Sequence, residues 1–133
     1  MPCIFCTFIQ QNQQLIYQDD LVAAFNDHKP SAQVHILVIP KAHISDIGQL
    51  TFNDISLVEH MTEVCNSLLQ ERGCNWITMF HHQCCISVRH LHLHGMILPF
   101  KGMLSKILFS KCVTCTPSQV IAKLYSKSTI LPV

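Results

Sequence analysis

Charged residues are scarce in this sequence, and neither sign of charge predominates. Lysine and arginine total 9 against 8 aspartates and glutamates, and charged residues make up 13% of the chain. A surface that coats nucleic acid needs a basic excess, so we expect no nucleic-acid partner. No apolar run approaches the roughly 20 residues of a membrane helix, and no basic segment precedes an apolar one at the N-terminus. We therefore expect no membrane association and a cytoplasmic location, with the nucleus as a second compartment.

Internal repeats, linkers and low-complexity segments are also missing, which favours a single domain over residues 1–133. A chain of this length buries a substantial core without covalent cross-links. Its eight cysteines are compatible with the disulfide framework of a small secreted domain. A hydrophobic content of 49% and the lack of a secretory signal favour reduced thiols instead.

The longest predicted element is a helix over residues 51–72, where apolar residues recur every three or four positions. Thr51 or Asn53 can cap it, and Arg72 and Gly73 mark its end. The other predicted elements are a short helix at 3–10, strands at 15–17, 21–25, 34–39, 75–80 and 86–98, and short helices at 103–109 and 118–125. This order predicts an α+β fold with an antiparallel sheet.

Three histidines alternate with two leucines in the segment His90-Leu91-His92-Leu93-His94. Side chains alternate between the two faces of a strand, so the leucines are predicted in a core and the histidines in a pocket. The alternatives are a surface strand with incidental histidines or a single metal site. Imidazole mostly serves as base, nucleophile, phosphate donor or metal ligand, which favours the pocket.

This segment resembles the signature of the histidine triad (HIT) nucleotide hydrolases and transferases. Residues 34–44 (VHILVIPKAHI) and the N-terminal Cys3-Ile4-Phe5-Cys6 resemble the other landmarks of that family. The resemblance spans residues 3–98 and leaves a divergent tail at 99–133. It implies a five-stranded antiparallel sheet with one long helix and short terminal helices, and a homodimer formed through that helix and a sheet edge.

The chemistry expected of the triad is nucleophilic attack on phosphorus. A neutral imidazole is a competent nucleophile near pH 7, provided that an acceptor holds its other ring nitrogen. His92 is the central member, and a backbone carbonyl near His90 is the natural acceptor. His94 and His35 can donate hydrogen bonds to phosphate oxygens. The resemblance implies that His92 is the nucleophile and His35 the fourth active-site histidine.

His90 and several residues outside the triad are candidates for binding a purine nucleotide. The resemblance implies that Asp27 holds the ribose hydroxyls, and the alternative is a loop cap. Ser87 precedes the triad where the family often has a serine near the scissile bond, and the alternative is an ordinary strand residue. Phe25, Leu37 and Ile16 are candidates for a purine pocket, although core packing explains most of their surface.

Cys3 and Cys6 have the C-x-x-C spacing that suits two thiolates on one zinc ion. The resemblance implies that His43 and His90 complete the site, which makes zinc structural, because the chemistry itself requires no cofactor. The alternative is a pair of buried free cysteines. Cys112 and Cys115 share the spacing but lack an obvious histidine pair, so we interpret them as ordinary thiols.

Two positions depart from the family pattern. Met79 stands where an asparagine is usual, which predicts a phosphate cradle that is incomplete or rebuilt by His81, His82 or Gln83. Gly95 replaces a β-branched residue and is expected to loosen its strand by up to ~1 kcal/mol. The tail from Phe100 onward resembles the third Hint-type branch.

The sequence therefore predicts a Hint-type hydrolase that cleaves the P–N bond of adenosine 5'-monophosphoramidates, such as adenylated lysine, through a nucleotidyl-histidine intermediate. Two alternatives stay open. One is a hydrolase of dinucleoside polyphosphates or acyl-adenylates that uses the same histidine. The other is a nucleotide- or zinc-binding interaction protein with weak catalysis, which the departure at Met79 favours.

Overall fold

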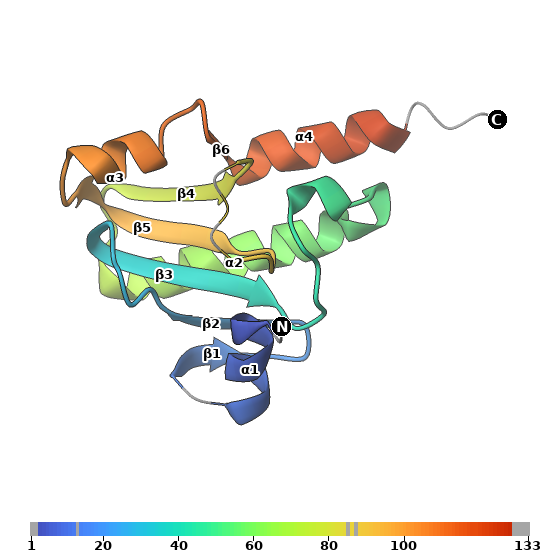
Figure 1. Cartoon of the computed structure of the whole chain (residues 1–133), viewed down its shortest axis with the longest axis horizontal. Coiled ribbons are helices and arrows are strands. Elements are labelled where there is room, and N and C mark those ends of the chain that lie inside the picture. Colours follow the sequence, from blue (N-terminus) through green and yellow to red (C-terminus); the bar gives the residue numbers. More distant parts are fainter. Residues whose placement is uncertain (1–2, 13, 85, 87, 129–133) are drawn as a thin grey trace.

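An antiparallel sheet forms the centre of the molecule (Figure 1). The computed structural model describes residues 3–12, 14–84, 86 and 88–128. The strand order is β1-β2-β3-β5-β4-β6. The strands are β1 (Leu15–Gln18), β2 (Val22–Asn26), β3 (Ala32–Pro40), β4 (Ile77–His82), β5 (Leu93–Phe100) and β6 (Thr114–Cys115). The α+β antiparallel architecture is confirmed, and the two-residue β6 extends the expected five strands to six.

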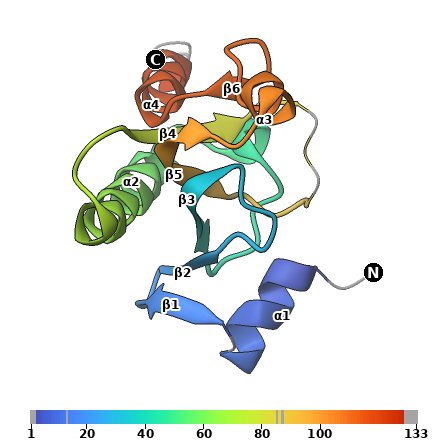
Figure 2. The same cartoon turned by 90° about the vertical axis from the view of Figure 1, so that its left-hand side faces the viewer.

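Helix α2 (Ile55–Arg72) covers one face of the sheet, together with α4 (Pro117–Ser128) (Figure 2). It follows the short 3-10 turns η1 (Ile47–Gln49) and η2 (Phe52–Asp54). Thr51 caps η2 instead of α2: its amide donates to the Asp54 carboxylate over 2.8 Å, and α2 begins only at Ile55. The predicted apolar stripe faces the sheet, and its buried residues are Ile55, Val58, Met61, Val64, Cys65, Leu68 and Leu69.

Gly95 lies where α2 approaches the sheet most closely. It pairs with Ile36 of β3, and a Cβ atom at this position would collide with the Cys65 sulfur and lie 3.0 Å from Leu69 Cδ1. A β-branched residue therefore does not fit between the sheet and the helix. The glycine permits close helix packing, which corrects the expectation that it only loosens the strand.

Two strands begin later than the sequence pattern indicates. β4 starts at Ile77, and β5 starts at Leu93 instead of residue 86. The bonds before β5 are not those of a strand ladder: the Leu91 amide donates to the carbonyl oxygen of Ile44, and the His90 ring donates to the carbonyl oxygen of Pro40, the last residue of β3. The sequence preceding β5 thus connects to the irregular segment after β3, which a local alternation pattern does not reveal.

Helix α1 (Ile4–Gln11) lies on the opposite face of the sheet from α2 (Figure 2). Its buried Phe5 packs with Ala23, Phe25, Leu37 and Ile39 of β2 and β3. The tail forms α3 (Met103–Leu108) and α4, as predicted. In the described parts of the chain, none of the helices combines the length and the apolar character needed to cross a bilayer.

Candidate functional site

The triad histidines and leucines lie on opposite sides of their segment, as predicted. Leu91 and Leu93 are buried in the core beneath α2. His90, His92 and His94 are also nearly inaccessible, with exposed fractions of 0%, 8% and 7%. The alternation persists although only His94 lies within β5. These three imidazoles form a buried cluster, which excludes incidental surface histidines.

His92 has one ring nitrogen bonded and the other available. Its Nδ1–H donates to the carbonyl oxygen of His90 over 2.7 Å, so the lone pair of the neutral ring resides on Nε2. Burial lowers the pKa of His92, which keeps the ring neutral near pH 7. The Phe5 ring meets it edge-on with 5.3 Å between centroids. The predicted backbone acceptor near His90 is therefore present.

His35 and His94 are brought together by the pairing of β3 with β5. His35 lies opposite Met96 and His94 opposite Leu37, so the two imidazoles are diagonal neighbours on one face. The Ser31 amide donates to His35 Nδ1 over 2.9 Å, which leaves the His35 proton on Nε2. That proton points to His94 Nδ1 at 2.8 Å. Burial lowers the pKa of His35 to about 4, against the opposing charge of Asp27, and holds the pKa of His94 well below its usual range.

His82, one of the three residues that the sequence offered for a rebuilt phosphate cradle, contacts the triad, and so does Phe109, for which the sequence gave no role. His82 Nδ1 lies 3.2 Å from His94 Nε2, and His82 Nε2 lies 2.7 Å from the carbonyl oxygen of Leu108. The Phe109 ring centroid is 4.9 Å from those of both His82 and His94. The tail beyond residue 98 thus covers the site. Local pattern offers no signal for this contact, because the residues are far apart in the chain.

Asp27 performs the loop-capping role that was its alternative. Its Oδ1 accepts from the Lys29 amide over 2.9 Å, and its Oδ2 lies 3.4 Å from His35 Nε2. A groove of about 410 Å³ opens beside it, lined by Asn26, Asp27, Pro30, Gln33, Val34, His35 and Arg72. Ribose binding by Asp27 remains a prediction, and Ser87 lies outside the described residues.

The proposed purine-pocket residues divide between the two faces of the sheet. Phe25 and Leu37 share the α1 face and are 4% and 5% exposed. The Phe25 ring contacts the rings of Phe5 and Phe8, with centroids 5.1 and 5.4 Å apart. Ile16 packs against the α2 cluster, so it is a core residue and does not line the triad side.

Met79 does not belong to the histidine cluster. It pairs with Gly95 and packs against the α2 core, on the face opposite His94. Met79 is therefore not part of the triad face, and a phosphate cradle rebuilt by His81, His82 or Gln83 stays a prediction. The neighbouring His81 is fully buried, neither of its ring nitrogens has a hydrogen-bond partner, and burial lowers its pKa to about 4.

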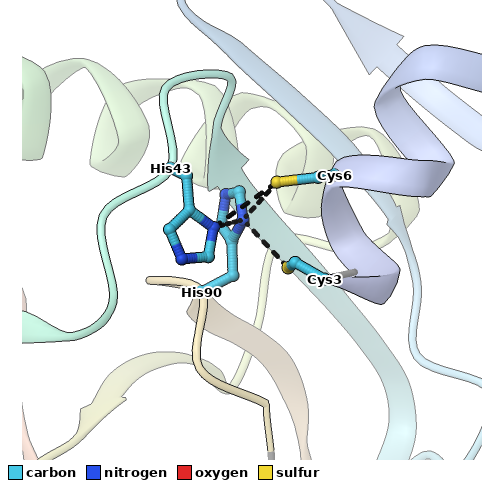
Figure 3. A group of neighbouring side chains, drawn as sticks. All are labelled: Cys3, Cys6, His43 and His90. Carbon is cyan, nitrogen blue, oxygen red and sulfur yellow. Dashed lines mark hydrogen bonds between the residues drawn. The ribbon is translucent and has the colours of Figure 1, made fainter. Parts of the chain in front are cut away.

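Four predicted metal ligands converge beside the triad (Figure 3). Cys3 and Cys6 come from the start of α1, His43 from the segment after β3, and His90 from the segment before β5. His90 Nδ1 lies 3.4 Å from Cys3 Sγ, 3.5 Å from Cys6 Sγ and 3.2 Å from His43 Nδ1. Tetrahedral zinc with bonds of about 2.0–2.3 Å separates its ligand atoms by about 3.3–3.8 Å. The donor set and its spacing fit zinc.

The outer contacts of His90 also suit a metal ligand. Its Nε2–H donates to the Pro40 carbonyl oxygen over 2.8 Å, which leaves the Nδ1 lone pair directed at the two sulfurs. Free thiols are found at Cys3 and Cys6, and also at Cys112 and Cys115, as expected for reduced cysteines. Since Cys3 and Cys6 are only half-buried and face two imidazoles, the alternative of two buried structural thiols does not describe them.

Comparisons with known proteins agree with the geometry. Residues 2–109 match the family described as the scavenger mRNA decapping enzyme C-terminal binding domain. The chain is 43% identical over 104 residues to the Arabidopsis thaliana bifunctional adenosine 5'-phosphosulfate phosphorylase/adenylylsulfatase HINT4, covering 74% of this chain and 71% of that protein. It is 32% identical over 117 residues to the Xenopus tropicalis adenosine 5'-monophosphoramidase HINT3, covering 82% of this chain and 76% of that protein.

A solved structure shows the same similarity. A histidine triad protein from Clostridium difficile superposes with a TM-score of 0.66 at 32% identity, covering 74% of this chain and 92% of that one. The match of residues 2–109, the relatives above 30% identity and the buried histidine cluster all agree. The chain belongs to the histidine triad family of nucleotide hydrolases.

Proposed function

We propose that this protein hydrolyses adenosine 5'-monophosphoramidates, with His92 as the nucleophile. The observation that carries the proposal is the hydrogen bond from His92 Nδ1–H to the His90 carbonyl oxygen, which leaves Nε2 unprotonated in a water-poor cluster. A fixed tautomer with a free lone pair is the state that attacks phosphorus. The similarity to the HINT3 enzymes, named as adenosine 5'-monophosphoramidases, supports this substrate class.

The reaction has two steps. His92 Nε2 attacks the α-phosphorus, a new P–N bond forms to the imidazole, and the P–N bond to the amine breaks as that amine takes up a proton from solvent. Water then attacks the adenylyl-imidazole, its oxygen bonds to phosphorus, the P–N bond to His92 breaks, and one proton returns to solvent, which releases AMP and restores His92. His94 lies beside His92, with ring centroids 4.8 Å apart, where a hydrogen bond to a phosphate oxygen stabilises the developing charge.

The nucleoside occupies the α1 side of the sheet in this proposal. Phe25 and Leu37 are 4% and 5% exposed beneath α1, so they would form only the floor of a purine site whose nearest apolar neighbour to His92 is Phe5, with ring centroids 5.3 Å apart. Asp27 is half-buried at the rim of the adjoining groove, and its carboxylate is a suitable acceptor for two ribose hydroxyls. Binding there exchanges the Lys29 amide bond for bonds to the sugar.

The proposed metal is a structural zinc ion held by Cys3, Cys6, His43 and His90. When bound, it would join α1 to the segment after β3 and to the triad segment itself, and it would supply no chemistry to the reaction. The ring of His90 is fixed by this site, and its carbonyl oxygen fixes His92. The metal would thus support catalysis by holding His90, whose carbonyl oxygen orients the ring of His92.

A second candidate substrate is adenosine 5'-phosphosulfate. The 43% identity to HINT4, named as a phosphorylase and sulfatase of that compound, favours it. The same attack by His92 would expel sulfate, which needs no proton, whereas an amine does. Turnover of both compounds by the purified protein, with AMP and the second product quantified, separates the candidates. A higher kcat/KM for the phosphoramidate supports the proposal, and a higher value for the phosphosulfate replaces it with the second candidate.

A further inference from the structure

His82 is the last residue of β4, and it bonds to both the triad and the tail. Its Nδ1 faces His94 Nε2 at 3.2 Å, and its Nε2 faces the carbonyl oxygen of Leu108 at 2.7 Å. The ring is half-buried and lies against Phe109, with 4.9 Å between centroids. Leu108 is the last residue of α3.

Both ends of this hydrogen-bond series fix the positions of its protons. At one end, the Ser31 amide donates to His35 Nδ1, so the neutral His35 carries its proton on Nε2 and donates to His94 Nδ1. His94 must then carry its proton on Nε2 and donate to His82 Nδ1. At the other end, a carbonyl oxygen accepts from His82 Nε2–H, which leaves His82 Nδ1 free to accept. Both ends therefore require that each ring donates toward His82: His35 to His94, and His94 to His82.

This direction leaves no spare donor on His35 or His94. The His35 Nε2–H donates to His94 Nδ1 over 2.8 Å and also faces Asp27 Oδ2 at 3.4 Å, so it is already engaged and is not a free donor for an incoming ligand. The His94 N–H lies at the boundary, where its partner His82 is the more exposed ring. A phosphate oxygen that bonds to His94 must therefore replace His82 Nδ1.

We propose that His82 is a positioning residue that acts as an internal ligand of His94, occupying its Nε2–H until a substrate phosphate oxygen replaces it. The inference rests on the proposed function, because it takes a nucleotide phosphate as the competing group. Without His82, the buried His94 N–H lacks an acceptor in the free protein, a state that is costly relative to a bonded one.

The attachment to Leu108 indicates how His82 leaves. Within the short helix α3, Met103, Leu104 and Ile107 are 70%, 69% and 58% exposed, whereas Phe109, directly after Leu108, is buried with Ala32 and Met96, so the chain at Leu108 moves only as far as this ring allows. His82 moves away from His94 while its bond to the Leu108 carbonyl oxygen is retained.

Two substitutions at this position separate the roles of the ring and the acceptor. His82→Phe keeps a planar ring against Phe109 and removes both nitrogens. His82→Asn retains an acceptor where Nδ1 lies. AMP binding is measured by calorimetry for the wild type and both variants, after circular dichroism establishes that each is folded. We expect His82→Phe to bind AMP about three- to tenfold more tightly, because no hydrogen bond has to be displaced, and His82→Asn to stay near the wild type.

Kinetics and nuclear magnetic resonance complete the test. KM for the phosphoramidate falls in His82→Phe while kcat changes less, a split that a purely structural role does not produce. Long-range proton–nitrogen spectra of the nucleotide-free protein show a protonated Nε2 on His94 and an unprotonated Nδ1 on His82. Weaker or unchanged AMP binding by His82→Phe, a proton on His82 Nδ1, or no AMP binding by the wild type overturns the inference. Tighter binding by the variant without phosphoramidate hydrolysis by the wild type overturns the proposed function alone.

Discussion

The carbonyl oxygen of His90 accepts the Nδ1–H of His92 over 2.7 Å, while the ring of His90 faces Cys3 and Cys6 in the metal site. One residue thus connects the metal site to the proposed nucleophile. Movement of His90 displaces the acceptor that fixes the His92 tautomer. The metal site and the catalytic site are therefore expected to respond together.

We predict one zinc ion per chain, lost in a Cys3→Ser/Cys6→Ser double variant. Serine replaces a thiolate with a poor zinc ligand, and two of the four ligands are removed. Elemental analysis of the purified proteins measures the metal directly. Cys74→Ser is the matched control, because Cys74 is an exposed free thiol outside the cluster. Zinc retained by the double variant would place the metal elsewhere.

Metal removal should also reduce turnover without direct contact with substrate. In the zinc-free protein, His90 is no longer joined through the metal to Cys3, Cys6 and His43. We expect kcat to fall about 10- to 100-fold, as is typical when residues that support a site from outside are removed. The kinetics are compared before chelation, after chelation and after zinc is restored. A kcat unchanged by chelation that removes all zinc would show that the two sites are independent.

Asp27→Asn should weaken AMP binding about tenfold or more, because it removes the charge that two ribose hydroxyls bond to. The same substitution should have little effect on the binding of 2'-deoxy-AMP, which lacks one of those hydroxyls. Asp20→Asn, at an exposed acidic position in the β1–β2 turn, serves as the control. Equal weakening for both nucleotides would assign Asp27 to loop structure alone.

The stability of the protein should fall in mild acid. Burial lowers the pKa of His35 and of His81 to about 4, below the usual value near 6.5 in the unfolded chain. The unfolded chain therefore takes up protons that the folded chain does not. The contribution of these groups is complete above about pH 6.5 and is lost as the pH falls toward 4, by roughly 1.4 kcal/mol per pH unit for each group.

His81→Phe tests this origin. The side chain is fully buried, and its ring nitrogens make no well-formed hydrogen bond and face only the backbone of His92, so an apolar ring removes one titrating group at little cost in hydrogen bonding. The free energy of unfolding, measured with denaturant between pH 4 and 7, should depend less steeply on pH in the variant. The difference in slope should correspond to about one proton fewer taken up on unfolding than in the wild type. His28→Gln, at an exposed position, should leave the slope unchanged. An identical slope in His81→Phe would assign the acid sensitivity to other groups.

Gly95→Ala should destabilise the fold by about 1–3 kcal/mol, because the new methyl group meets the Cys65 sulfur. Cys65→Ala in the same chain removes that sulfur and should recover part of the loss. Denaturant unfolding of the two single variants and the double variant measures the coupling. Purely additive effects would show that the helix and strand adjust without contact at this position.

Much of the fold and of the metal site was predictable from the sequence because their signals are local. The α2 stripe repeats at helical spacing, and the leucines of the triad segment alternate with the histidines. The resemblance placed His43 and His90 with Cys3 and Cys6, and the structure brings them together. The predicted start of β5 was wrong, since Leu91 bonds to Ile44 in the segment after β3, and the His90 ring bonds to Pro40 at the end of β3, in place of a strand ladder.

The unpredicted features of the site depend on contacts between distant residues. Leu108 and Phe109 follow His82 by more than 25 positions, so neither the hydrogen bond nor the ring contact leaves a periodic pattern. The sequence also did not predict which face of the sheet carries Met79, because that depends on how β4 pairs with β5. Only the register of β4 against β5 shows that it points toward α2.

The central claim is that His92 is the nucleophile of a phosphoramidate hydrolase. The most direct measurement is turnover of a fluorogenic adenosine phosphoramidate by the wild type and by His92→Ala at equal amounts of folded protein. We expect hydrolysis by the wild type and a loss of about 10³-fold or more in the variant, because the covalent step has no substitute. Comparable turnover by both proteins would contradict the assignment of His92. No turnover by the wild type, with AMP still bound, would contradict the hydrolase itself.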